Sequence, residues 1–346
     1  MNLWKVCWRR PFLISEEIKL RTDFPGKEQE EQVKKFIIKR VLSVIPVLFV
    51  VSVVIFSLVH LVPGDPAAAM LGDLATEEDI AALRARMGLD RPLVEQYVVW
   101  IGNIFKGDFG MSVANNETVA SMIGSHIKPT ISLAVYALVI AACIAIPMGM
   151  VAARKKGAAV DHAVTVVSLA GISLPSFLLG LFLMLVFSVR LRMFPVSGYV
   201  DISEGLIPHL KSITLPAIAL GFMNAALMMR MTRATMLEVL NSDYIKMAKA
   251  KGVKGFFLVA KHAFKNTLVT LITVFGQSIV QALSGAAVVE SLFAIPGLGQ
   301  LMVNSIGRRD YYVIQTIVLL IAVINVVINM LIDILYGLVD PRVRVN

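Results

Sequence analysis

Six long stretches without Asp, Glu, Lys or Arg constrain this chain more than any other feature. Each contains 18 to 28 residues, and a helix needs about 20 apolar residues to cross the hydrocarbon core of a bilayer. The stretches are residues 41–64, 129–153, 162–189, 212–229, 266–289 and 311–332. Only 16% of the chain is charged, against about 25% in a soluble domain. The sequence therefore predicts an all-α membrane protein with six transmembrane helices.

The distribution of basic residues indicates the orientation. If the residues before the first stretch face the cytoplasm, the inside segments hold 23 of the 33 Lys and Arg residues and the outside segments hold 10. This bias follows the positive-inside rule, and the opposite orientation would violate it. Both termini are therefore predicted to be cytoplasmic. The net charge of +9 reflects membrane topology, and no nucleic-acid partner is expected.

These patterns divide the chain into predicted segments. They are a cytoplasmic N-terminal extension at 1–36, a first transmembrane helix at 37–62, an extracytoplasmic insert at 63–128, a five-helix core at 129–340 that contains a cytoplasmic loop at 238–266, and a cytoplasmic tail at 341–346. The extension lacks a continuous apolar core, so it is not a secretory signal. Its residues 4–14 predict a short helix on the membrane surface or disorder. Spans two and three are predicted to form a hairpin, and residues 291–307, rich in Pro and Gly, a loop.

The insert is predicted to be a small, mostly helical cap outside the membrane. Thr76 can cap a helix that has three acidic residues in its first turn and ends at Gly88. A second helix is predicted over residues 93–105, followed by a turn at 107–110. One face of this second helix carries Val94, Tyr97, Val98 and Ile101.

The basic loop between spans four and five contains a short predicted helix. Asn241 or Ser242 can cap its start, and Gly252 can end it in the left-handed conformation. Its predicted outward face repeats at i, i+3, i+4 and i+7 and consists of Tyr244, Met247, Ala248 and Lys251. Alanines at 248 and 250 leave little bulk, so the surface of another protein could approach closely. A second helical segment, at about 254–265, leads back into the membrane.

This loop resembles the cytoplasmic coupling loop, often called the EAA loop, of ABC-importer membrane subunits. The resemblance is closest to the branch that carries dipeptides, oligopeptides, glutathione or nickel complexes. It rests on Asp243-Tyr244, on Ala250-Lys251-Gly252 and on His262-Ala263 before Asn266. At the position of the generic EAA triad of this loop, the chain has Lys246-Met247-Ala248. Further matching segments, in order, are residues 61–66, 87–93, 107–112, 173–177, 296–299 and 340–342.

The resemblance implies a permease subunit in a bacterial inner or plasma membrane. Its implied partners are a second homologous permease subunit in a heterodimer, two cytoplasmic ABC ATPases and an extracytoplasmic substrate-binding protein. ATP and Mg²⁺ would be used by the ATPases, because the chain has no Gly-x-x-x-x-Gly-Lys-Ser/Thr segment. No cofactor, metal or catalytic residue is expected on this chain. The implied ATPase-coupling residues are Asp243, Tyr244, Met247, Ala248, Ala250, Lys251 and Gly252.

The outer segments are expected to meet the binding protein. The expected contact residues are Asp65, Asp108, Arg309 and Asp310, and the alternative is that such residues only stabilise turns at the membrane surface. Peptides are the cargo that the resemblance favours, with glutathione, nickel complexes and sugar-like solutes left open.

Two other classes of protein are alternatives to a permease subunit. A self-contained secondary transporter or channel usually places ionisable groups in mid-membrane, and the six stretches contain only histidines near their ends. A membrane-embedded enzyme would need a catalytic constellation, and none stands out.

Overall fold

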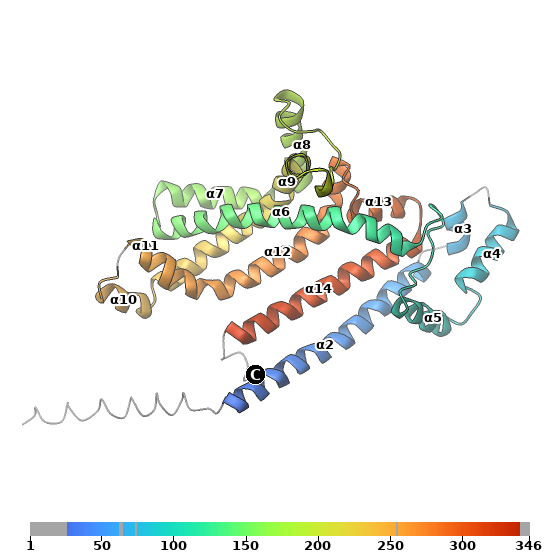
Figure 1. The fold of residues 1–346 in the computed structure, drawn as a ribbon, viewed down its shortest axis with the longest axis horizontal. Helices are drawn as coiled ribbons and strands as arrows, with labels where there is room; N and C mark the ends of the chain where they lie inside the picture. The colour runs from blue at the N-terminus through green and yellow to red at the C-terminus, as the bar shows by residue number, and fades with distance from the viewer. Residues whose placement is uncertain (1–25, 62–64, 73–74, 254, 340–346) are drawn as a thin grey trace, which may run out of the picture.

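The computed structural model describes residues 26–61, 65–72, 75–253 and 255–339. Within these residues the regular structure is helical apart from one isolated β-bridge between Met111 and Thr118, so the prediction of an all-α protein is confirmed. Five helices are long and apolar enough to cross a membrane. They are α2 (Gly26–Leu61), α6 (Val119–Arg154), α9 (Leu206–Leu240), α12 (Phe264–Phe293) and α14 (Tyr311–Val339). Figure 1 shows them running lengthwise through the molecule.

The apolar part of the first helix that could cross a membrane begins at Ile37, where the sequence places the start of span one. The helix itself is longer, because α2 already begins at Gly26. Three predictions lie outside the described residues: the surface helix at 4–14, the stop at Pro63 and Gly64, and the tail at 341–346. The first and last long helices pack against each other, and Arg40 of α2 forms an ion pair of 2.9 Å with Asp333 of α14.

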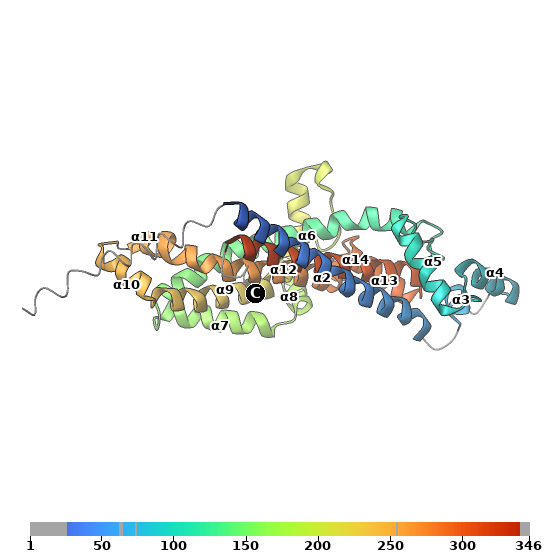
Figure 2. The same ribbon diagram turned by 90° about the horizontal axis from the view of Figure 1, so that it is seen from below.

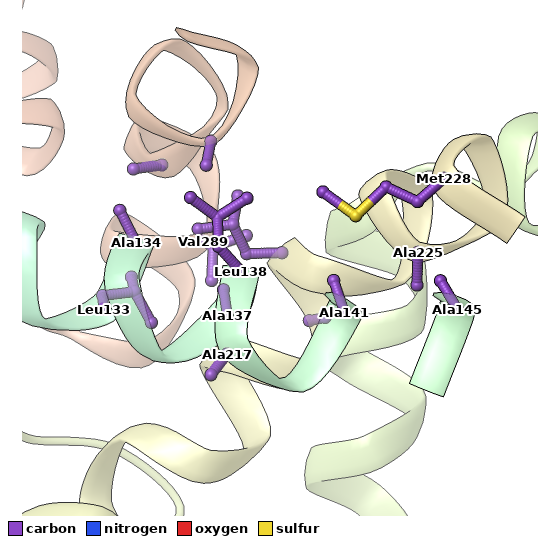
Figure 3. Close-up of a cluster of buried hydrophobic side chains, with 14 of the residues drawn as sticks. Leu133, Ala134, Ala137, Leu138, Ala141, Ala145, Ala217, Ala225, Met228 and Val289 are labelled. Atoms are coloured by element: carbon purple, nitrogen blue, oxygen red, sulfur yellow. The ribbon is translucent and has the colours of Figure 1, made fainter. Parts of the chain in front are cut away.

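The central contact of the bundle joins α6 to α9. The facing side chains are small: Figure 3 shows Ala134, Ala137, Ala141 and Ala145 of α6 close to Ala217 and Ala225 of α9. Small residues let two helix backbones approach closely, which is the main route to helix association within a membrane. α9 also packs against α7, α8 and α12, and it is the most buried of the five long helices. The core therefore forms around α9.

The third predicted span is not one straight helix. α7 (Ala159–Ser173) and the pair α8 (Ser176–Leu183) and η1 (Met184–Arg190) meet at a bend of 104°. Leu174, between them, has an extended backbone, because a residue before proline is disfavoured in the helical region and Pro175 follows. The bundle has six spans only if this bent pair counts as one. The predicted hairpin with span two holds for α7 alone, since α8 projects sideways (Figure 1).

The helices of the insert agree with the sequence prediction. α3 (Pro66–Leu71) is followed by α4 (Glu77–Met87) and α5 (Leu93–Phe105). Thr76 and Asp79 form a reciprocal capping box, and Gly88 ends α4 with a left-handed backbone. The hydrogen bonds that Thr76 donates hold the pKa of Asp79 below its ordinary value. Figure 2 shows these helices at the end of the molecule opposite α10 and α11.

The predicted loop at 291–307 is wrong, because α13 (Leu298–Gly307) is a helix. Its start is capped by residues distant in sequence. The carboxylate of Glu290, in α12, accepts from the backbone N–H groups of Gly299 at 2.8 Å and Gln300 at 3.0 Å. The hydroxyl of Thr130, in α6, donates to Glu290 at 2.7 Å and accepts from the N–H of Leu298 at 2.8 Å. All three N–H groups of the first turn are thus paired, which local sequence cannot reveal.

The packing of α13 on α12 leads to a prediction with an internal control. A Cβ at Gly299 would lie 2.2 Å from the Cα of Ala287, so Gly299→Ala should force the two helices apart at a cost of about 1–3 kcal/mol. A Cβ at Gly307, in the same helix, would meet nothing within 4 Å. Gly307→Ala should therefore be neutral or slightly stabilising. The measurement is the melting temperature of each purified variant in detergent, and equal melting temperatures would contradict the proposed contact.

Candidate functional site

The short helix in the segment between α9 and α12 is α10 (Asp243–Ala250). It lies with α11 (Gly255–Phe257) at the extreme end of the molecule away from the insert (Figures 1 and 2). Gly252 ends it with a left-handed φ of 86°. The N–H of Gly252 donates to the backbone carbonyl of Lys249 at 3.0 Å, and the N–H of Val253 donates to the backbone carbonyl of Ala248 at 3.1 Å. These two bonds form a Schellman motif, and the predicted stop at Gly252 is confirmed.

The start of α10 differs from the expected cap. Ser242 occupies the N-cap position, but its side chain accepts no N–H of the helix. Its hydroxyl donates instead to the carbonyl of Val239, at 2.7 Å, in the last turn of α9. Ser242 is thus the N-cap residue, as predicted, but it makes no side-chain capping bond. Its hydrogen bond links the end of α9 to the residue that directly precedes α10.

The two faces of α10 have different environments. Ile245 is 0% exposed and Ala248 is 8% exposed. Both pack in a cluster with Ala153 of α6, Met236 of α9, and Leu258 and Ala263 of η3 (Leu258–Ala263). The expectation that Ala248 shares the outward face is wrong, because its side chain points into this cluster with Ile245. The anchoring role of Ile245 was not anticipated from the sequence, although Ile245 is the one β-branched apolar residue of the helix.

The outward face carries the other predicted coupling residues. Tyr244 and Met247 are about half exposed, and the rest of the set is also exposed: Asp243, Ala250, Lys251 and Gly252. Asp243 pairs with Lys246 at 2.8 Å within the helix. Because the opposite face is anchored to α6, α9 and η3 at once, a force on the outward face would reach several helices of the bundle. Their role in coupling remains a prediction.

An ion pair holds the helices just before α10. Asp161, in the first turn of α7, has a side chain 4% exposed and pairs with Arg233 of α9. Arg233 donates to both carboxylate oxygens, one of them at 2.9 Å, and the N–H of Gly157 donates to the carboxylate at 2.9 Å. Charge-assisted bidentate pairs are among the stronger hydrogen bonds. The pair fixes the loop at 154–158 to α9, two turns before that helix ends. Arg233 was not anticipated from the sequence.

The candidate residues at the insert end are mostly engaged in turns. Asp65 accepts from the N–H of Ala67 and pairs with Arg84 at 3.1 Å. Asp108 accepts from the N–H of Gly110 at 3.0 Å. Asp310 is 2% exposed and accepts from Ser112 at 2.5 Å. These contacts fit the structural alternative, whereas Arg309 lies exposed.

A cavity also lies at the insert end. It has a volume of about 680 Å³ and is lined by α4, α5, residues 108–113 and Tyr312. Within the described ranges, no three His, Cys, Asp or Glu side chains gather as metal ligands. The geometry thus provides an exposed helix anchored at one end of the bundle and an insert with a cavity at the other.

The ion pair between Asp161 and Arg233 can be tested by a double-mutant cycle. Asp161→Asn or Arg233→Gln alone should lower the free energy of unfolding by about 2–3 kcal/mol, between the values typical of exposed and buried pairs. The double variant should lose less free energy of unfolding than the two single variants lose together, because neither charge is then left unpaired. Urea or thermal unfolding in detergent measures this. Strictly additive losses would show that the two charges do not interact.

Comparison with known proteins agrees with this architecture. Residues 145–345 match the family described as binding-protein-dependent transport system inner membrane component, and residues 33–134 match its N-terminal counterpart. One relative is "Probable peptide ABC transporter permease protein" of Sinorhizobium fredii. It is 39% identical over 309 residues, covering 89% of this chain and 99% of that protein. Another is the di/tripeptide transport system permease protein DppB of Pseudomonas aeruginosa, 38% identical over 330 residues, covering 89% and 98% respectively.

The matched regions include α9, α12, α14, the insert and α10, together with most of α2 and of α6. They begin after most of the predicted N-terminal extension, which the family models do not cover. The chain therefore belongs to the family of binding-protein-dependent transport system inner membrane components, and it is a multi-pass ABC transporter permease subunit of the inner membrane.

Proposed function

We propose that this permease forms half of the translocation pathway of an ATP-driven importer, and that the pathway carries di- or oligopeptides. The observation that carries the proposal is α10, whose outward face is exposed while Ile245 and Ala248 anchor it to the bundle. A helix placed in this way can pass on movement produced by another protein. The proposal that the cargo is a peptide rests on the relatives, several of which are named as peptide permeases.

The motor in this proposal is a pair of separate ATPases at the α10 end. That end holds the basic loop at 154–158 and the basic helix α10, and the positive-inside rule supports a cytoplasmic location for such basic segments. Tyr244, Met247 and Lys251 would meet the ATPase, with ATP and Mg²⁺ bound there and no cofactor on this chain. Both termini would then be cytoplasmic. The insert would face the substrate-binding protein, with Arg309 as its exposed candidate contact.

A second, homologous permease would complete the pathway. Among the described residues, α8 projects from the bundle with Phe177, Leu178, Leu181 and Phe182 about half exposed. Such a side arm is suited to packing against another membrane subunit. We favour a heterodimer of two related permeases.

The competing hypothesis of a self-contained secondary transporter has less support. Such a protein needs an ionisable group that faces a pathway. The buried carboxylate of Glu290 is instead occupied by Thr130 and by the start of α13.

Reconstitution of the co-purified complex in proteoliposomes tests the function. We expect uptake of labelled di- and tripeptides that requires ATP and the loaded binding protein. Uptake of glutathione or a nickel complex in place of peptides would replace the proposed cargo and leave the machinery intact. Uptake by this chain alone, driven by an ion gradient, would overturn the proposal.

The end of α10 provides a sharper test of coupling. A Cβ at Gly252 would meet nothing within 4 Å, but φ is 86°, which costs an L-residue about 1–2 kcal/mol. Gly252→Val should thus lower the equilibrium constant for forming the native α10 end by roughly 5- to 30-fold. ATP-driven uptake should fall while ATP hydrolysis continues. Gly252→Asn is the matched control, because asparagine tolerates the left-handed conformation, and it should retain most uptake. Equal uptake by the two variants would count against a coupling role.

A further inference from the structure

Helix α5 has an exposed apolar face that the transport function does not use. Its 13 residues contain no Lys or Arg and one acid, Glu95. One stripe, at spacings of 4, 3 and 4 residues, consists of Val94, Val98, Ile101 and Phe105, of which Ile101 is half-buried and the other three are exposed. Val94 is 76% exposed and Phe105 is 86% exposed. The neighbouring α4 is different, since its exposed residues are mainly charged. Water is a suitable environment for α4 but not for this stripe of α5.

The face of α5 beside this stripe is attached to α2, and it includes Tyr97, which the sequence grouped with Val94, Val98 and Ile101. The side chain of Gln96 pairs with the ring of His60 at 3.0 Å, and the phenol of Tyr97 pairs with the hydroxyl of Ser52 at 2.7 Å. The ring of Phe56 contacts the rings of Tyr97 and Trp100, with centroids 5.4 and 5.8 Å apart. These contacts fix the rotation of α5 about its own axis. The apolar stripe therefore cannot turn inward without breaking them.

The same contacts fix the depth of α5. Ser52 and Phe56 belong to the apolar window Ile37–Ser57 of α2, which is long enough to cross the membrane. Tyr97 meets both residues, so this part of α5 lies beside the outer part of a span and not beyond it. A helix of 13 residues is about 20 Å long and cannot cross the hydrocarbon core. Figure 2 shows α5 crossing the end of the molecule beside α2.

We propose that the stripe of Val94, Val98, Ile101 and Phe105 lies in the outer leaflet of the bilayer. α5 is then an interfacial helix, and only the rest of the insert stands in water. The lipid is the occupant because the stripe carries no charge and lies at the level of exposed apolar side chains of α2, among them Phe49 and Val54. Amphipathic helices of this kind bury their apolar face at the boundary between headgroups and acyl chains. Trp100 and Tyr97 are the residues typical of that depth.

This placement changes the expected picture of the insert. The sequence predicts a cap wholly outside the membrane, whereas α5 would hold one side of that cap on the lipid surface. The inference depends on the chain spanning a membrane, and it does not depend on the cargo or on the ATPase.

Spin labels on single cysteines test the proposal in nanodiscs of phosphatidylcholine and phosphatidylglycerol. Cys7 and Cys143 are first replaced by serine in the protein purified with its bound subunits. Labels go on Val94→Cys, Val98→Cys and Phe105→Cys. Three reference sites complete the set: Val50→Cys on the exposed side of α2, Glu78→Cys on the charged surface of α4, and Phe293→Cys in the core, where the label replaces a large buried side chain. The measurement is the collision rate of each label with oxygen, which concentrates in lipid, and with a water-soluble nickel chelate.

We expect the ratio of oxygen to nickel collisions at the three stripe positions to resemble that at Val50, several-fold above that at Glu78. A ratio like that of Glu78 would show that the stripe faces water and would overturn the proposal. Low collision rates with both reagents, as in the core at position 293, would also overturn it, because they would show that another protein covers the stripe. A melting temperature equal to that of the unlabelled protein confirms that each labelled variant is folded.

Discussion

The close contact between α6 and α9 is the interaction on which the rest of the structure depends. Within a bilayer, lipid is as apolar as the helix surface, so association depends on tight packing between backbones. Ala137 and Ala217 are both 0% exposed where the two helices meet. Once α6 and α9 are joined, their surfaces provide the platform for α7, α8 and α12. Bulkier side chains along this seam would separate the helices that carry every other contact.

Buried polar contacts then fix the two ends of this bundle. At the insert end, Thr130 of α6 and Glu290 of α12 cap α13. At the other end, Asp161 of α7 and Arg233 of α9 form the ion pair beside the last turns of α9. Unpaired polar groups are costly in a low-dielectric environment, so such contacts persist only when each partner is satisfied. A motion that begins at α10 therefore acts on helices whose ends are already defined, and a transporter needs such rigidity to move as a unit.

Much of the fold could be predicted from sequence because its signals are local. The apolar stretches, the capping box at Thr76 and the left-handed glycine at 252 each depend on a few neighbouring residues, and the structure confirms them. Predictions failed where a distant group decides the outcome. α13 forms because Glu290 and Thr130 reach its first turn. Ala248 turns inward because the ends of α6 and η3 lie there to receive it. Neither neighbour can be identified by spacing along the chain.

By itself, the sequence determined that the chain is helical, that it lies in a membrane, and which short helix stands apart at the basic end. These properties follow from hydropathy and charge, which act on each segment separately. Only the tertiary structure decided that span three bends at Pro175, that α10 is anchored by Ile245, and that α5 presents its apolar stripe outward. The physical reason is that an amphipathic pattern specifies two faces of a helix, while the neighbouring helices decide which face is covered.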